Sequence, residues 1–294
     1  MRAALVSAAR RAGIRPDGAV LLRLHSNAIF LIPGAGLVVR IATNPDALPQ
    51  VTASIRVTRW LAARDFPCTV PADVVGQPFV VDGRVASFWR YHPVVEHVRA
   101  AAADLGRLLR DLHAAPAMRQ PPPPLDHPLV SVAAAVEAAG GALSDADREW
   151  LATRIDQLRK VWSTIAFSRP PCLIHGDAHD DNLLRTADGA VLLGDWDHVA
   201  IGPREWDLVQ PHYTRRRFGR PSDRDLDEFA ESYGWDVRQW AGLDVLIAIR
   251  EITGLAPYLR SAAQVPALAE ELAHRLSSLR TGSMAATWTS PTRR

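Results

Sequence analysis

The eight residues from His175 to Asn182, read as HGDAHDDN, could carry out acid–base chemistry or bind a metal ion. Two histidines, three aspartates and one asparagine lie between a Leu-Ile pair and a Leu-Leu pair. Imidazole and carboxylate groups move protons near neutral pH and are also common metal ligands. This stretch is therefore the first place to look for a functional site.

A β-hairpin is predicted directly after Asn182. Two short apolar runs flank the turn-forming pair Asp188-Gly189, which is typical of a hairpin. Because a hairpin brings its open ends together, Asn182 before the first strand and Asp195 after the second should lie side by side. Asp177 lies on the loop that enters the hairpin. Carboxylate and amide oxygens of this kind suit Mg²⁺.

Two other interpretations of the stretch stay open at this point. Asp, Asn and Gly also form turns, but turn formation alone does not explain so many polar groups between apolar strands. His175, Asp177 and His179 alternate in a pattern that could bind zinc, and His198 or His212 could add a further ligand. The zinc interpretation predicts a metal-dependent hydrolase.

Three motifs in order make phosphoryl transfer the favoured interpretation. HGDAHDDN, LLGDWD and GPREWDL follow one another between positions 175 and 208. Together they resemble the catalytic and metal-binding segments of the aminoglycoside phosphotransferase and choline kinase family, a branch of the protein-kinase-like fold. The resemblance implies an α+β, bilobal protein-kinase-like fold with a small β-rich N-terminal lobe and a larger, mainly helical C-terminal lobe. It also implies Mg²⁺ as cofactor and ATP or GTP as co-substrate.

The resemblance assigns roles to individual residues. Asp177 would be the catalytic base that orients and deprotonates an acceptor hydroxyl, and Asn182 and Asp195 would hold Mg²⁺ against the nucleotide phosphates. His175 would shape the loop. Asp207 would brace the catalytic loop, or would simply be an acid at the start of a helix.

Two further polar residues have no settled role in the sequence. His179 lies in the loop after Asp177 and could approach the acceptor. Asp197 follows Asp195 by two positions and is either a substrate contact or a solvated acid.

The nucleotide side of the site departs from the family pattern. The only lysine in the chain is Lys160, so Arg40 in GLVVRIA takes the place of the strand lysine that contacts phosphates. The helix glutamate that pairs with this cation is missing, because Gln50 and Ser54 occupy the expected place. A catalytically weak or silent nucleotide-binding relative is therefore an alternative function.

The remaining nucleotide contacts are predicted from the resemblance. Ser26 and Asn27, in a loop before a strand, would cover the phosphates. The backbone near Trp89, Arg90 and Tyr91 would hydrogen-bond the base between the lobes. The Trp89 side chain is equally well explained by core packing.

The N-terminal lobe is predicted to comprise residues 1–91. An amphipathic helix begins the chain, hairpins are expected around the turns at 33–36 and 82–83, and a helix is expected over 52–66.

The C-terminal lobe is predicted to comprise residues 92–280, with 281–294 as a loose tail. An amphipathic helix is expected at 104–115. Four prolines at 121–124 favour an extended connector. A long helix follows Ser144 in capping-box spacing, and the chain is again helical from 225 to 279.

Composition excludes several classes of protein. The chain of 294 residues has 48% hydrophobic and 22% charged residues and a net charge of +2, which is ordinary for a globular protein and does not predict nucleic-acid binding. No apolar run reaches the roughly 18 residues that span a membrane. Two cysteines, Cys68 and Cys172, form neither a disulfide framework nor a zinc site. A cytoplasmic protein is expected.

The expected partner is a small molecule with an acceptor hydroxyl, such as an antibiotic, amino alcohol or sugar. The fold does not choose among these acceptors or fix the oligomeric state. The basic run RRRFGR at 215–220 either favours an anionic acceptor or forms a solvated face.

Overall fold

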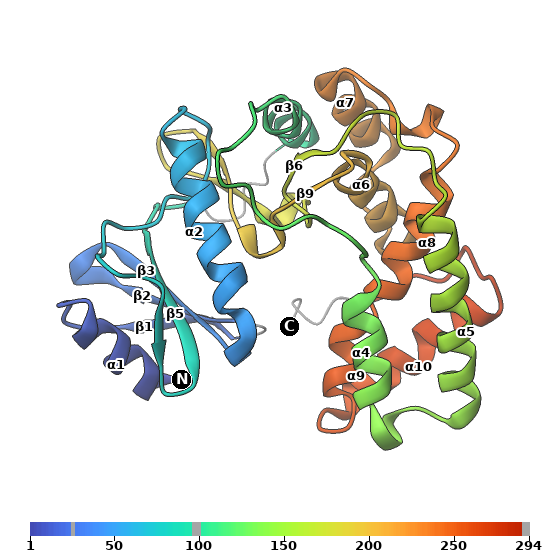
Figure 1. Ribbon diagram of the computed structural model, residues 1–294, viewed down its shortest axis with the longest axis horizontal. Helices are drawn as coiled ribbons and strands as arrows, with labels where there is room; N and C mark the ends of the chain where they lie inside the picture. The colour runs from blue at the N-terminus through green and yellow to red at the C-terminus, as the bar shows by residue number, and fades with distance from the viewer. Residues whose placement is uncertain (25–26, 96–100, 290–294) are drawn as a thin grey trace.

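The computed structural model describes residues 1–24, 27–95 and 101–289 and shows two lobes (Figure 1). The N-terminal lobe is built on a five-stranded antiparallel sheet in the order β1-β2-β3-β5-β4. Its strands are β1 (Val20–Leu24), β2 (Asn27–Ile32), β3 (Leu37–Ala42), β4 (Phe79–Val81) and β5 (Arg84–Arg90), with helices α1 (Arg2–Arg11) and α2 (Leu48–Ala62). Most of the C-terminal lobe is helical. The predicted α+β fold, with a small β-rich N-terminal lobe and a larger, mainly helical C-terminal lobe, is confirmed.

The two faces of the N-terminal sheet differ in what they contact. Phe30, Val39 and Phe88 stand opposite one another on β2, β3 and β5 and are buried in a core that includes α1. Because side chains alternate across a strand, the neighbouring row points to the other face. That row pairs Ile29 with Arg40. The sheet therefore presents Arg40 on the face away from α1.

Both predicted hairpins of this lobe are confirmed. The β2–β3 connection contains a 3-10 turn at Pro33–Ala35. The β4–β5 turn has Asp82 at φ +48° and Gly83 at φ +67°, which are the left-handed values that a type I′ turn requires. Strand β1 was not predicted, since all five of its residues are exposed and show no alternation.

Helix α2 begins four residues before the predicted helix and ends at Ala62. Its buried side chains Val57 and Leu61 share a core with Leu173 and Trp196 of the C-terminal lobe. The helix therefore joins the sheet to the segments that carry the chemistry.

The C-terminal lobe contains eight α-helices in the described residues. They are α3 (Ala102–His113), α4 (Val130–Ala138), α5 (Asp145–Trp162), α6 (Glu205–Phe218), α7 (Asp223–Tyr233), α8 (Leu243–Thr253), α9 (Ala256–Ser261) and α10 (Pro266–Arg280). Ser144 caps α5 by accepting a hydrogen bond from the Asp147 N–H at 3.1 Å, as its spacing predicted. No helix in the described ranges is long and apolar enough to cross a bilayer.

Two small two-stranded sheets position the segments that contain the HGDAHDDN and LLGDWD motifs. Strands β7 (Leu183–Arg185) and β8 (Val191–Leu193) form the predicted hairpin, with Leu183 opposite Leu193. Strands β6 (Cys172–Ile174) and β9 (Ala200–Gly202) pair outside this hairpin and were not predicted. Their pairing closes the whole segment from 175 to 199 at its base.

The predicted loose tail is wrong for residues 281–289. Trp288 is only 4% exposed, and its indole nitrogen donates to the Ser278 hydroxyl at 3.0 Å. The guanidinium of Arg217 lies 4.8 Å from the Trp288 ring centroid. An apolar ring of this size completes the core between the C-terminal helices, which holds the segment down. Residues 290–294 lie outside the described residues.

Candidate active site

Asp207, in the first turn of α6, braces the start of the catalytic loop. Its buried carboxylate accepts the backbone N–H groups of His175 and Gly176, each at 2.7 Å, and lies 3.1 Å from the His113 ring. Burial alone would raise the pKa of Asp207, but the hydrogen bond and charge of His113 hold it below the usual value. The ionised carboxylate thus holds the backbone of residues 175 and 176 in place.

His175 is a structural residue in this arrangement. Its Nε2 lies 2.8 Å from the Gly194 carbonyl oxygen, and its Nδ1 accepts the Asp177 N–H at 3.3 Å. The ring packs edge-on against Trp196 at 4.8 Å, and burial lowers the pKa of His175. Both ring nitrogens are therefore occupied: Nε2 ties the HGD segment to the GDWD segment, and Nδ1 holds the turn within the HGD segment.

Gly176 is required by a close crossing of two backbones. It adopts φ +86°, and a β-carbon at this position would lie 2.1 Å from the His198 carbonyl oxygen. The Gly176 carbonyl accepts hydrogen bonds from Trp206 and Arg250, each at 3.1 Å. No residue with a side chain fits here without moving the loop.

Asp177 projects from this fixed loop with one side open. Gln210 Nε2 donates to its Oδ1 at 3.1 Å, the Arg250 guanidinium lies 3.9 Å away, and His179 Nε2 lies 3.6 Å from Oδ2. The side chain remains 34% exposed. Burial would raise the pKa of Asp177, but His179, and then His198 and Arg250, hold it well below its usual range. Gln210 and Arg250 were not predicted.

The hairpin brings Asn182 and Asp195 to the same cavity, as the sequence predicted for its open ends. The Asn182 amide nitrogen donates to the Asp177 carbonyl at 2.9 Å, so its oxygen is the free atom of the amide. Asp195 adopts φ +58° and is 39% exposed. An amide oxygen and a carboxylate form a donor set that fits a hard cation such as Mg²⁺.

This cavity lies between the lobes and has a volume of about 260 Å³. The sheet face that carries Arg40 forms one wall, together with Ile29, Val38 and Trp89. Asn182 and Asp195 form part of the opposite wall. The cavity thus joins an apolar sheet surface to a group of oxygen ligands, which suits a base and its phosphates.

The connection between the lobes differs in detail from the sequence prediction. The Arg90 N–H donates to the Val70 carbonyl and the Tyr91 N–H to the Gly36 carbonyl, both at 2.9 Å. The Arg90 side chain pairs with Asp73 at 3.0 Å. The N–H groups of Arg90 and Tyr91 are therefore bonded within the lobe, and the predicted hydrogen bonds between a base and the backbone near Trp89 to Tyr91 stay a prediction.

Trp89, Arg90, Tyr91 and His92 all line this cavity. The Trp89 indole nitrogen donates to the Ser87 hydroxyl at 2.9 Å, and the ring is almost fully buried. His92 Nε2 is buried without a hydrogen-bond partner, and burial lowers the pKa of this histidine. His92 was not predicted as a site residue. Its position directly after Tyr91, in the segment that connects the two lobes, was the only signal in the sequence.

Arg40 contacts two carboxylates of the GDWD segment. It lies 2.8 Å from Asp195 and 2.6 Å from Asp197. Burial would lower the pKa of Arg40, but Asp197 and Asp195 raise it. The Asn27 amide donates to the same Asp197 carboxylate at 2.7 Å. Asp197 is thus a partner of the N-terminal lobe; Ser26 lies outside the described residues.

Helix α2 does not provide a carboxylate for Arg40. The Ser54 hydroxyl donates to the Trp196 carbonyl at 2.6 Å, and the Gln50 amide to the Val199 carbonyl at 3.5 Å. These residues hold the backbone on both sides of Asp197. Helix α2 therefore positions the segment that carries Asp197, the carboxylate that Arg40 contacts.

The zinc arrangement considered from the sequence does not form. Within the described ranges, the only three acidic or histidine side chains close enough to share one ion are His179, Asp180 and Asp181, whose ligand atoms lie within 4.8 Å of one another. His175 is turned inward. His212 lies on α6, where burial lowers its pKa to about 4.

Comparison with known proteins adds the family and the fold. Residues 21–246 match the family described as "Phosphotransferase enzyme family", and no curated protein matches the chain significantly. A solved amicoumacin kinase, bound to AMP-PNP and Ca²⁺, has a TM-score of 0.72 at 11% identity, covering 98% of this chain and 95% of that chain. An aminoglycoside phosphotransferase complexed with GDP and kanamycin has a TM-score of 0.65 at 17% identity, with 96% and 98% covered.

A choline kinase from Streptococcus pneumoniae has a TM-score of 0.63 at 10% identity, covering 95% of this chain and 100% of that chain. At these identities the similarities show a shared fold. They do not identify an acceptor.

Proposed function

The chain belongs to the phosphotransferase enzyme family, and from this premise we propose that it is an ATP- or GTP-dependent small-molecule kinase. The observation that carries the proposal is the position of Asp177 beside Asn182, whose amide donates to the Asp177 carbonyl at 2.9 Å. The base and the metal ligands thereby form one unit. Family membership argues against the metal-dependent hydrolase considered from the sequence.

In the proposed reaction, Asp177 orients an acceptor hydroxyl and receives its proton. The hydroxyl oxygen forms a bond to the γ-phosphorus as the bond to the β,γ-bridging oxygen breaks, and the nucleoside diphosphate leaves. Mg²⁺, held by Asn182 and Asp195, would neutralise charge on the phosphates. Arg40 would contact the α- and β-phosphates from the sheet. The acceptor is an antibiotic, amino alcohol, sugar or similar metabolite.

We further propose that Asp197 replaces the missing helix glutamate as the partner of Arg40. A cation that meets phosphates needs a fixed position, and a carboxylate partner provides one. Asp197 lies 2.6 Å from Arg40 and is itself held by Asn27. With Asp197 as its partner, Arg40 could still bind the nucleotide phosphates although α2 has no glutamate. This argues against a catalytically silent relative.

Thermal unfolding tests the proposed function. Near-saturating ATP with Mg²⁺ should raise the unfolding temperature by roughly 5 °C, because a ligand that binds only the folded state stabilises it. ATP with EDTA should give a much smaller shift. Turnover is then measured as ATP consumption across aminoglycosides, macrolides, amino alcohols, sugars and hydroxy acids. Absence of any metal-dependent shift would exclude the kinase, whereas a shift without turnover would favour the silent alternative.

Replacing Asp197 by asparagine should raise the KM for Mg-nucleotide about 10-fold, the effect of losing one charge-assisted hydrogen bond. Adding Ser54→Glu should restore much of the loss, because a glutamate from α2 would supply the missing carboxylate. Gln50→Glu provides a second route if Ser54→Glu fails to fold. Steady-state kinetics at fixed acceptor measures both effects.

The control for this prediction is Asp244→Asn, which removes an exposed carboxylate paired with Arg216 far from Arg40. It should leave the KM unchanged. If a higher Mg²⁺ concentration alone restored the wild-type KM in Asp197→Asn, Asp197 would be a metal ligand, and the proposed pairing of Asp197 with Arg40 would be wrong.

A further inference from the structure

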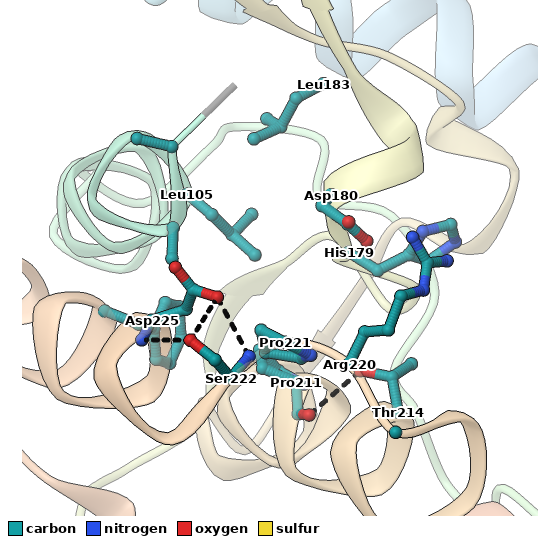
Figure 2. Close-up of a pocket in the computed structure, with 14 residues that line it drawn as sticks. Leu105, His179, Asp180, Leu183, Pro211, Thr214, Arg220, Pro221, Ser222 and Asp225 are labelled. Atoms are coloured by element: carbon teal, nitrogen blue, oxygen red, sulfur yellow. Dashed lines mark hydrogen bonds between the residues drawn. The ribbon is translucent and has the colours of Figure 1, made fainter. Parts of the chain in front are cut away.

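A second cavity opens beside the loop that follows Asp177. It has a volume of about 410 Å³ and lies among α3, the loop at 179–183, α6 and the start of α7 (Figure 2). Its apolar lining includes Leu105, Leu183, Pro211 and Phe229. His179, which is 3.6 Å from Asp177, forms part of its wall. A molecule in this cavity would therefore lie next to the proposed base.

The basic run at 215–220 meets this cavity through one arginine. The other three arginines of the run make ion pairs: Arg215 with Asp223 at 3.0 Å, Arg216 with Asp244 at 2.5 Å and Arg217 with Glu251 at 2.6 Å. Arg220 lines the cavity, and its side chain points from the α6–α7 connection toward the wall that carries His179 (Figure 2). The run is therefore neither wholly a solvated face nor wholly a ligand site.

Arg220 is the unsatisfied group of this cavity. Its Nε is covered from solvent without a hydrogen-bond partner, and in the described part of the chain its guanidinium makes no ion pair. A covered donor without an acceptor is destabilising, and a ligand that accepts a hydrogen bond from it would remove that cost.

The other polar groups of this wall are already used. Ser222 and Asp225 bond each other in the cap of α7 at 2.6 Å. The Thr214 hydroxyl donates to the Pro211 carbonyl at 2.9 Å. Asp180 also has an interaction of its own. The group left to recognise a ligand is thus a cation with a planar fork of donors.

We propose that this cavity binds the acceptor and that the acceptor carries an anionic group, a carboxylate or a phosphate, which binds Arg220. An apolar portion of the acceptor packs against Leu105, Leu183 and Phe229, and its hydroxyl reaches Asp177. This inference rests on the proposed kinase function. It favours hydroxy acids and phosphorylated polyols over polycationic aminoglycosides.

The test compares acceptors that differ only in charge. ω-Hydroxy carboxylic acids are measured beside their primary amides and the corresponding amino alcohols, and sugar phosphates beside the free sugars. The two anionic series distinguish a carboxylate from a phosphate. The wild type should prefer at least one anionic series by about 10-fold or more in kcat/KM, as expected for a charge-assisted contact.

Substitutions at Arg220 make the test specific. Arg220→Met keeps the apolar stem, and it should lower kcat/KM for the preferred anionic series about 10- to 100-fold while leaving the neutral series nearly unchanged. Arg220→Glu should shift the preference toward amino alcohols. Arg215→Met, in the same run but paired with Asp223, is the matched control and should change neither series.

Each outcome has a distinct meaning. A preference for neutral or cationic acceptors, or an equal loss across all series in Arg220→Met, would overturn the anionic acceptor and leave the kinase proposal standing. Loss of the metal-dependent nucleotide shift would instead overturn the kinase proposal. If no compound turns over, anionic compounds must still raise the unfolding temperature of the Mg-ADP complex more in the wild type than in Arg220→Met; otherwise the inference fails.

Discussion

Replacing Asp177 by asparagine is expected to lower kcat by about 10²- to 10⁴-fold, the usual contribution of a positioned general base. The metal-dependent stabilisation by nucleotide should remain, because the contact of Asn182 with this residue uses the Asp177 backbone carbonyl. An asparagine side chain has nearly the same shape and can still accept from Gln210. The substitution thus removes the proton acceptor without removing the loop.

The electrostatic surroundings of Asp177 refine this expectation. His179, His198 and Arg250 hold the pKa of Asp177 well below its usual range, so the carboxylate is ionised from about pH 5 upward. A carboxylate of low pKa is a weak proton acceptor, and its contribution includes orienting the hydroxyl. The pH profile of kcat above about pH 5 should show no acidic limb from Asp177.

Asp156→Asn provides the control for the Asp177 substitution. Asp156 is exposed on α5 and lies 3.5 Å from Arg159, so its replacement should change neither turnover nor nucleotide binding. Retention of wild-type turnover by Asp177→Asn would show that another group takes the proton.

The geometry of the candidate site was predictable from the sequence only for residues that are close together along the chain. Asn182 and Asp195 are separated by one hairpin, and hairpin turns have strong sequence signals. Gln210 and Arg250 approach Asp177 from α6 and α8, and they follow the HGD segment by more than 30 and 70 residues in the sequence. Only tertiary packing brings them to the loop, so no local signal could identify them.

The pairing of Arg40 shows a different limit of sequence reasoning. The missing glutamate on α2 was evident, but the contact between Arg40 and Asp197 depends on how the two lobes pack against each other. Trp288 was missed for a related reason. A terminal segment rich in Gly, Ser and Thr resembles a loose tail, but the buried Trp288 ring and the hydrogen bonds of Thr289 to Glu271 hold it against the C-terminal helices.

Asp195 links the two lobes in a way that makes its replacement informative. The carboxylate faces Arg40 at 2.8 Å and is also a proposed ligand of Mg²⁺. Burial would raise the pKa of Asp195, but Arg40 lowers it, so the group is ionised and available to a cation. Without a metal ion, the same negative charge repels nucleotide phosphates and competes with them for Arg40.

Asp195→Ala should therefore reverse the metal dependence of nucleotide binding. With Mg²⁺, the roughly 5 °C stabilisation by ATP should largely disappear, because one of the two proposed metal ligands is lost. With EDTA, ATP should stabilise the variant more than the wild type, since Arg40 is freed from one of its two carboxylates. The fold should survive, because Asp197 still pairs with Arg40.

Thermal unfolding of both proteins, each with ATP–Mg²⁺ and with ATP–EDTA, measures this reversal. Asp195→Asn serves as the matched control for shape: it keeps an oxygen ligand and should lose less of the Mg²⁺ effect than alanine. An Asp195→Ala protein with wild-type stabilisation by ATP–Mg²⁺ would place the metal elsewhere. That result would leave Asn182 as the only remaining proposed ligand of Mg²⁺. The two ends of the β7–β8 hairpin would then not form a shared metal site.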